Sequence, residues 1–294
     1  MRLRTLSRHL PAVLFLTAGC ARAAGSPDPG TGAGTVFFSG FATGNYDLFS
    51  VRADGYRLRR LTADPEFEQH PAVSPDGQRV AYLRQRTGSA RYDLWIMNAD
   101  GTDKRRRVAA EGDVLTIYAP AWSPDGRRLL YSYQETGSPR RRLATVHAVL
   151  GDPVVLGAEG WNATWSPNGR YLAYVRDVAG LPQLVTSRPD GSDLVLRADL
   201  PGCCGMPQWS PDGTRIHFQT TAGGNTTTHI VYLAGGTPAR QAAPGAQGSV
   251  AWSADGMRFA FADAFGDLWV APAHGPAERI VAGAVALAGI AWGR

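Results

Sequence analysis

The chain has 294 residues and a formal net charge of +5, with 30 Lys or Arg residues against 25 Asp or Glu. Three of the basic residues, Arg2, Arg4 and Arg8, lie in the N-terminal leader, so the remaining sequence has 27 basic and 25 acidic residues. This near balance argues against nucleic acid as a partner. Two basic runs, Lys104 to Arg107 and Arg140 to Arg142, are expected in solvated loops or outer strands.

The first 33 residues have the pattern of an export signal followed by a tether. A basic segment up to Arg8 precedes the apolar stretch Leu10 to Thr17, and two small residues come directly before Cys20. This order predicts a secretory signal peptide over residues 1–19 rather than a membrane span. Residues 20–33 are rich in Gly, Ala and Pro. They predict a flexible tether, and the folded domain is expected over residues 34–294.

Small residues followed by Cys resemble a bacterial lipobox. By that resemblance Cys20 becomes the lipid-modified N-terminus of the mature protein, and Ala21 favours the outer membrane where the organism has one. The membrane is then a partner through the lipid anchor only. The alternative is an ordinary signal peptide in which Cys20 has no special role.

A short tag recurs through the rest of the sequence. Its serines lie 49, 43, 44 and 43 residues apart, the period expected when each repeat is one four-stranded propeller blade. Pro and Asp or Asn suit the corners of a type I turn, and Gly suits the left-handed position that follows. Each tag therefore predicts a tight turn between two antiparallel strands. The copies are Val73-Ser-Pro-Asp-Gly77, Trp122-Ser-Pro-Asp-Gly126, Trp165-Ser-Pro-Asn-Gly169, Trp209-Ser-Pro-Asp-Gly213 and Trp252-Ser-Ala-Asp-Gly256.

The two ends of the repeat region predict how the ring closes. Thr35 to Ser39 aligns with the second strand of the other repeats, whereas Gly289 to Trp292 aligns with the first. The sequence therefore predicts an all-β fold, a six-bladed β-propeller of four-stranded antiparallel blades, in which the N-terminal and C-terminal strands pair within one blade. Such closure removes the sheet edges that favour aggregation, and we expect a monomer.

The repeated Trp-Ser-Pro-Asp-Gly, the aromatic-rich third strand and the Ala-Asp-Gly turn resemble the TolB-like six-bladed propeller family of WD-like repeats. The likeness covers nearly the whole sequence after residue 33, and the N-terminal domain of TolB has no counterpart in it. The resemblance implies a propeller that docks partners of the cell envelope. Because the tag itself is turn and packing chemistry, it carries no activity.

The remaining cysteines, Cys203 and Cys204, are adjacent in the loop expected to lead into the fifth blade. Export favours oxidation, and flanking glycines would accept the distortion of a vicinal disulfide, whose Cα atoms lie only about 3.8 Å apart. The alternative, which the sequence supports equally well, is a pair of free thiols in a surface loop.

Aligning the inner strands on the Trp of the tag predicts a channel mouth that is polar and aromatic on one side. Such a mixture suits a peptide, a sugar or another small polar ligand, and a water-filled channel is the alternative. The predicted channel mouth comprises Glu68, Gln69, His70, Tyr118, Trp161, Asn162, Cys203, Cys204 and Met206.

Motifs of catalysis are not found in the sequence: the histidines are scattered over different repeats, and there is no Gly-x-Ser-x-Gly or His-Glu-x-x-His. Aspartates that recur at the start of third strands, such as Asp47, Asp93 and Asp267, indicate strand-end hydrogen bonding. We therefore expect no metal and no cofactor, and a binding module rather than an enzyme. The alternatives are an exported hydrolase or lyase acting on a carbohydrate or lactone, with His70 and Glu68 as acid and base candidates, and a purely structural envelope lipoprotein.

Overall fold

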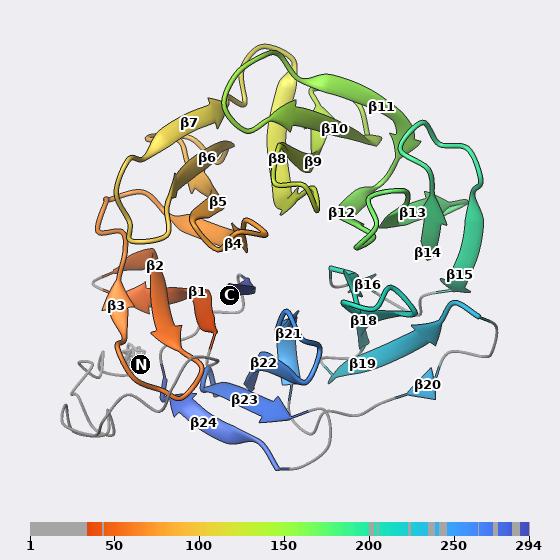
Figure 1. Ribbon diagram of the computed structural model, residues 1–294. Coiled ribbons are helices and arrows are strands. Elements are labelled where there is room, and N and C mark those ends of the chain that lie inside the picture. Colours follow the sequence, from red (N-terminus) through yellow and green to blue (C-terminus); the bar gives the residue numbers. More distant parts are fainter. Residues whose placement is uncertain are drawn as a thin grey trace, which may run out of the picture.

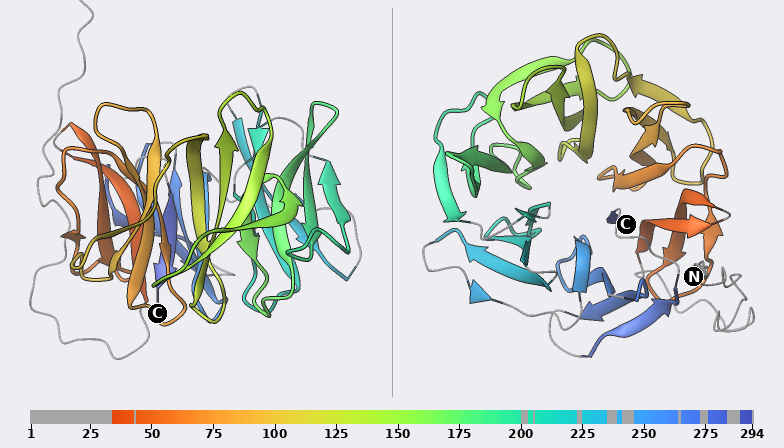
Figure 2. Two further views of the ribbon diagram at one scale, coloured as in Figure 1. Left: turned by 90° about the horizontal axis from the view of Figure 1, so that it is seen from above. Right: turned by 180° about the vertical axis from the view of Figure 1, so that it is seen from behind.

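The computed structural model is a ring of six antiparallel β-sheets around a central axis (Figure 1). Seen from the side, the sheets stand next to one another as the blades of a short disc (Figure 2). The structure describes residues 34–42, 44–199, 203–204, 206–222, 225–234, 239–240, 246–263, 265–272, 276–283 and 289–293. The predicted signal peptide, Cys20 and the tether lie outside these residues. Nowhere in the described part is there a helix with the length and apolar character needed to cross a membrane.

Each blade runs from an inner strand at the axis to an outer strand at the rim, which confirms the predicted fold class. The strands, from inner to outer, are β25 (Ile290–Gly293), β1 (Thr35–Ala42), β2 (Asn45–Arg52) and β3 (Arg59–Arg60) in blade one; β4 (Glu68–Val73), β5 (Arg79–Gln85), β6 (Tyr92–Asn98) and β7 (Arg105–Val108) in blade two; β8 (Val114–Trp122), β9 (Arg128–Glu135), β10 (Arg141–His147) and β11 (Val154–Glu159) in blade three; β12 (Trp161–Trp165), β13 (Leu172–Val178), β14 (Leu181–Ser187) and β15 (Val195–Asp199) in blade four; β16 (Cys203–Cys204) and β17 (Gln208–Trp209), then β18 (Arg215–Ala222), β19 (Asn225–Tyr232) and β20 (Ala239–Arg240) in blade five; β21 (Ala246–Trp252), β22 (Arg258–Asp263), β23 (Leu268–Pro272) and β24 (Glu278–Val281) in blade six.

Blade one joins the first and last described strands. β25 pairs with β1 in antiparallel register, with Val36 opposite Trp292 and Phe38 opposite Ile290. Val36, Phe38 and Ile290 are buried in one apolar cluster together with residues of blade six. The predicted closure is confirmed, and the closing strand also supplies part of the core between two blades.

The apolar core lies between neighbouring blades rather than at the axis. One cluster joins Leu83 of blade two to Leu129 of blade three, and another joins Leu48 of blade one to Tyr82 of blade two. Burial of apolar side chains stabilises a protein by about 1.5–3 kcal/mol for each large one, so these contacts hold the blades side by side. The inner strands therefore pack against neighbouring blades, and their remaining side faces the axis.

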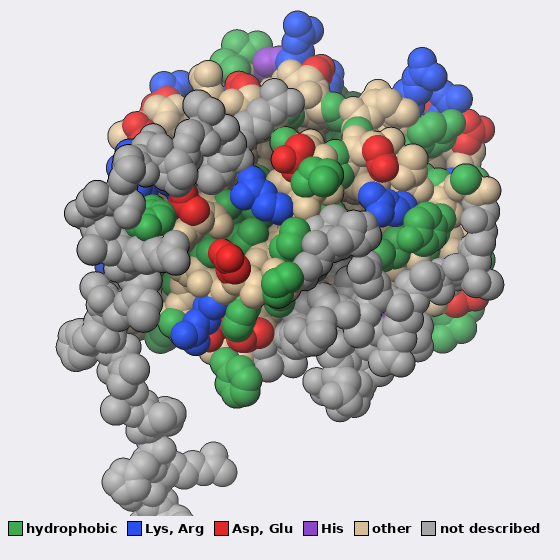
Figure 3. All heavy atoms as spheres, turned by 60° about the horizontal axis from the view of Figure 1, so that its bottom comes forward, with side chains coloured by type: hydrophobic (Ala, Val, Ile, Leu, Met, Phe, Trp, Pro, Cys, Tyr) green, Lys and Arg blue, Asp and Glu red, His purple; other side chains and the backbone are tan. Residues whose placement is uncertain are grey.

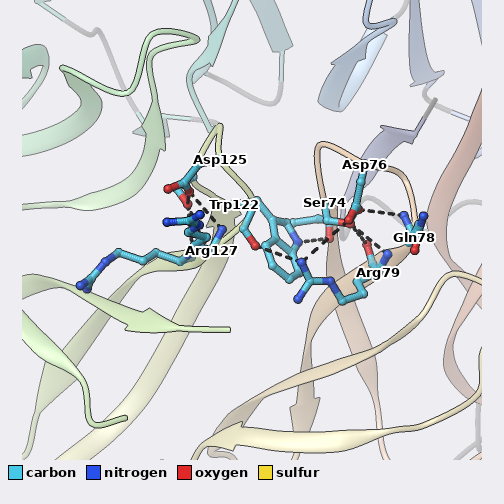
Figure 4. A network of polar contacts seen from close by, with 11 residues as sticks. Ser74, Asp76, Gln78, Arg79, Trp122, Asp125 and Arg127 are labelled. Atoms are coloured by element: carbon cyan, nitrogen blue, oxygen red, sulfur yellow. Dashed lines mark hydrogen bonds and ion pairs between the residues drawn. The ribbon is translucent and has the colours of Figure 1, made fainter. Parts of the chain in front are cut away.

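The tags form the predicted turns. In blade three the Ser123 hydroxyl donates to the Asp125 carboxylate at 2.6 Å and accepts the N–H of Arg128 at 2.9 Å, and Gly126 has φ 67°. Blades two and three are also joined at this point, because the Trp122 indole donates to the carbonyl of Ala72, directly before the preceding tag, at 2.9 Å (Figure 4). The indole nitrogens of Trp165, Trp209 and Trp252 are buried and have no hydrogen-bond partner among the described residues. The tag therefore fixes the turn, and its Trp donates a hydrogen bond to the neighbouring blade in the copy at Trp122.

The recurrent aspartates have the expected structural role. Asp93 accepts the N–H of Ala110 at 2.8 Å, and Asp267 accepts that of Gly283 at 2.6 Å, so each ties its third strand to the end of the outer strand. Asp47 instead pairs with Arg60 of the outer strand at 2.6 Å. The contacts of Asp93 and Asp267 confirm strand-end hydrogen bonding, and Asp47 has an ion pair at the corresponding position.

Candidate binding site in the central channel

The inner strands are bulged at one recurring position. Their pairing registers shift between Gln69 and Ala72, Tyr118 and Ala121, Trp161 and Thr164, and Gln247 and Val250. Bulges bend a strand and turn a side chain away from its regular direction.

Two bulged positions have unusual backbone conformations. His70 and Asn162 both have φ 54°, in the left-handed region that His and Asn enter more readily than most other residues. Gly289, directly before the adjacent strand β25, has φ 130°, and a Cβ added to it would lie 2.9 Å from the Cα of His70. Close approach of two inner strands at His70 therefore depends on that glycine.

A cavity of about 270 Å³ occupies the axis and is bordered by the inner strands of all six blades. His70, Asn162 and Met206 border it where these strands begin, and Pro75 and Pro211 of the tag turns border it where they end. Much of the wall between consists of small apolar residues. They include Ala72, Ala119, Ala121, Ala163, Ala251 and Ala291.

His70 contributes an imidazole with spare hydrogen-bonding capacity to this cavity. Its Nδ1 is buried and has no hydrogen-bond partner among the described residues. Desolvation lowers the pKa of His70 to about 4, so the ring is neutral near pH 7. A neutral imidazole has one donor and one acceptor nitrogen, and because Nδ1 is buried, Nε2 is the nitrogen available to a polar uncharged group in the channel.

Glu68 is placed differently from the expected rim. Its side chain is 0% exposed and does not border the cavity, and Arg84 lies 3.7 Å from its carboxylate. Burial raises the pKa of Glu68 to about 8, although the charge of Arg84 favours the ionised form. No hydrogen bond joins Glu68 to His70 within the residues that the structure describes. The two expected acid and base residues are therefore not brought together.

Gln69, Tyr118 and Trp161 are half-buried and stand outside the lining of the cavity. Tyr118 and Trp161 are instead brought together by Arg141, whose guanidinium carbon lies 5.1 Å from the centre of the first ring and 4.7 Å from that of the second. Sequence reasoning missed Arg141 because it assigned the run of arginines to a solvated loop or outer strand. The structure places Arg141 in β10, the third strand of its blade.

Cys203 and Cys204 form the short strand β16, which pairs with Thr220 and Thr221 of β18. They therefore extend the inner strand of blade five instead of lying in a loop. Their side chains are outside the described residues, so the vicinal disulfide stays a prediction. Among the described residues there is also no group of three or more His, Cys, Asp or Glu that could hold a metal ion.

Comparisons with known proteins show the fold. No family model matches the sequence, and a comparison with curated proteins gives no match. Among solved structures, TolB from Acinetobacter baumannii is similar with a TM-score of 0.72 at 17% identity, covering 88% of the present protein and 66% of that one. The present protein therefore spans just under two thirds of that TolB.

Two further structures share the architecture. A putative TolB from Agrobacterium tumefaciens has a TM-score of 0.65 at 17% identity, over 87% of the present protein and 92% of that one. An oligogalacturonate lyase from Vibrio parahaemolyticus has a TM-score of 0.55 at 14% identity, over 84% and 74% of the respective proteins. At these identities the likeness concerns the fold alone. The protein therefore has a TolB-like six-bladed propeller fold, closed through blade one.

Proposed function

We propose that this protein is an exported, lipid-anchored propeller that binds a protein or peptide segment of the cell envelope at its channel. The observation that carries the proposal is the pair of bulged, left-handed residues, His70 and Asn162, that border the axial cavity. Conformations of this kind cost of the order of 1–3 kcal/mol each and are concentrated at functional sites. A rigid ring of packed blades can hold His70 and Asn162 in these conformations.

The character of the cavity favours a narrow ligand that has both apolar and polar groups. Its wall of alanines, prolines and tryptophans offers apolar contact, and polar side chains such as Thr164 and Gln208 also border it, together with the imidazole of His70. An extended peptide combines these features, because its side chains are variable and its backbone supplies donors and acceptors. A small polar ligand or a sugar is the other kind of occupant that this wall accommodates.

The proposed location rests on the leader. Residues 1–19 have the order of a signal peptide, and Cys20 follows two small residues as in a lipobox. The fold shared with TolB is compatible with an envelope protein, and outer-membrane anchoring is part of the same proposal. On the face seen in Figure 3, basic and acidic side chains are interspersed with apolar ones, which is compatible with a monomer in an aqueous compartment.

Affinity capture from the native envelope tests the proposal. The channel variant His70→Asn with Met206→Ser keeps a residue that accepts the left-handed backbone and removes the imidazole and the thioether. We expect it to lose partners that the parent captures. The matched control is Gln78→Ala, whose exposed side chain comes directly after a tag turn. Equal capture by parent and channel variant would refute a binding role for the channel.

One observation supports the enzymatic alternative, a hydrolase or lyase acting on a carbohydrate or lactone. A carboxyl group whose pKa is raised to about 8, as for Glu68, can transfer protons near neutral pH. Its complete burial away from the cavity weighs against this role. Turnover of a panel of polyuronates and lactones, abolished by Glu68→Gln in a protein that remains folded, would establish the enzyme in place of the binding module.

A further inference from the structure

Arg141 differs from the other arginines that contact aromatic rings. Its guanidinium lies against two rings, Tyr118 from the inner strand of blade three and Trp161 from that of blade four, at the neighbouring strands β8 and β12 (Figure 1). Among the described residues, Arg79 and Arg84 each lie over one ring and also have polar partners. The guanidinium of Arg141 has no hydrogen bond or ion pair with any described residue, and its nitrogen atoms are not buried.

The rings around Arg141 are held in place by their own contacts. The Tyr118 hydroxyl donates to the side-chain oxygen of Gln134 at 3.0 Å, and the amide nitrogen of Gln134 donates to the carbonyl of Ser138 at 2.9 Å. On the other side, the N–H of Gly160 donates to the carbonyl of Arg141 at 2.9 Å, directly before Trp161. The guanidinium is therefore positioned before any ligand arrives.

Alternation along β10 explains why this arginine faces a neighbouring blade. Leu143, two residues further on, is fully buried in the apolar cluster between blades three and four. Residues two apart in a strand share a face, so Arg141 lies on the same face at the edge of that core. Its stem is covered and its charged end reaches the surface.

The surrounding charges leave Arg141 as the uncompensated one. Arg140 lies 3.7 Å from the carboxylate of Glu159, and Arg142 lies 3.4 Å from that of Glu135. Among the described residues, Arg141 is thus the member of this run without an acidic partner, and a carboxylate would supply the missing countercharge.

We propose that Arg141, held between Tyr118 and Trp161, binds a carboxylate of the peptide or protein partner, either an acidic side chain or the C-terminus of the partner. The planar guanidinium offers two parallel N–H donors to the two carboxylate oxygens, and the rings reduce its hydration on the faces that do not bind. This proposal rests on the proposed function and identifies the group that the channel mouth recognises.

Titration with short peptides tests the proposal, with the indole N–H signal of Trp161 in ¹⁵N–¹H spectra as the readout. The probes are Ac-Ala-Asp-Ala-NH₂ with its Asn counterpart, and Ac-Ala-Ala-Ala-OH with its amide, at constant ionic strength. We expect saturable shifts with one or both carboxylate peptides and none with the neutral counterparts. The peptide that binds identifies the source of the carboxylate. Equal shifts with the neutral peptides, or tighter binding of sodium phosphate, would overturn the assignment.

Variants separate the specific contact from general charge. Arg141→Lys keeps the charge but not the paired donors, so we expect binding about tenfold weaker. Arg140→Gln removes an exposed charge next to it and is expected to change the affinity by less than about threefold. Equal weakening by both variants would overturn the proposal. Partner capture by the His70 and Met206 channel variant is a separate measurement, so failure at Arg141 and failure of the channel can be told apart.

Discussion

The tag turns and the channel mouth place their ionisable groups in opposite situations. In the tags, hydrogen bonds from serine hydroxyls and from the backbone lower the pKa of Asp76, Asp125 and Asp255, and that of Asp212 to about 2. Near the mouth, burial raises the pKa of Glu68 to about 8 and lowers that of His70 to about 4.

This difference separates a structural face from a face with functional potential. Each tag carboxylate is stabilised in its charged form by the turn that contains it, so the charged form stabilises that turn. Burial near the mouth disfavours the charged forms of Glu68 and His70, and Nδ1 of His70 lacks a partner among described residues. Groups left in this state cost stability, and shifted pKa values of this kind are concentrated at functional sites.

Removal of the closing strand is expected to have the largest effect. Deleting residues 289–294 removes the four paired positions of β25 and the buried Ile290. The loss of about 5 kcal/mol or more is comparable with the total stability of a domain, so the ring should unfold cooperatively. Circular dichroism in the far and near ultraviolet checks this, with Val195→Ala on the exposed outer strand β15 as a control expected to change little. Local loss of structure alone would contradict closure through blade one.

The second prediction concerns the pH dependence of stability that Glu68, near the channel mouth, should cause. Because folding raises the pKa of Glu68 from 4.5 to about 8, the folded state keeps a proton that the unfolded state loses in this window. Stability from this group is therefore present below pH 4.5 and is lost as the pH rises to about 8. Glu68→Gln should remove that slope and stabilise the protein by about 1–3 kcal/mol at pH 8.

Urea unfolding at several pH values between 5 and 8 measures the slope. The control is Glu278→Gln, at an exposed position of β24, which should leave the pH dependence as in the parent. If Glu68→Gln has the same pH dependence as the parent, Glu68 is ionised in the folded state and the contrast between the two faces disappears.

A third prediction addresses the tags. Ser123→Ala removes the hydroxyl that joins Asp125 to the N–H of Arg128, and leaves that N–H without its acceptor. We expect a loss of about 1–2 kcal/mol in the free energy of unfolding. Gln78→Ala, at an exposed position directly after another tag, should change stability by less than about 0.5 kcal/mol. Equal effects of the two substitutions would show that the serine does not hold the turn.

The smallest effect is expected from completing the irregular tag. Ala254 occupies the place of proline in a turn whose bond from the N–H of Gly256 to the carbonyl of Ser253 matches that of the other tags. Ala254→Pro should stabilise the protein by about 0.5 kcal/mol because proline lowers the conformational entropy of the unfolded state. Pro211→Ala should destabilise the protein by a similar amount. Thermal unfolding of both variants compares them; destabilisation by Ala254→Pro would mean that this turn differs from its relatives.

The fold was predictable because its determinants are local and repeated. A turn such as Ser123 to Gly126 has the same backbone hydrogen bond in blades two to six, and its spacing gives the number of blades. The closure could be predicted because residues 289–292 have the character of a missing inner strand.

The site was predictable only in part, since it depends on contacts between blades. Alignment on the Trp of the tag identified His70, Asn162 and Met206, which border the cavity. It could not show that Glu68, two residues before His70, is buried against Arg84. Arg141 meets Trp161 only through the packing of blade three on blade four, and no spacing in the sequence contains that information.

Closure through blade one has a consequence for how the protein is made. β1 is the first described strand and β25 the last, with roughly 250 residues between them. At about 5–20 residues per second, the ribosome completes β25 roughly 10–50 s after β1. Throughout that interval the edge of β1 has no partner from its own polypeptide, and an open strand edge can pair with other molecules. The newly made protein is therefore most prone to aggregation before its final strand is available.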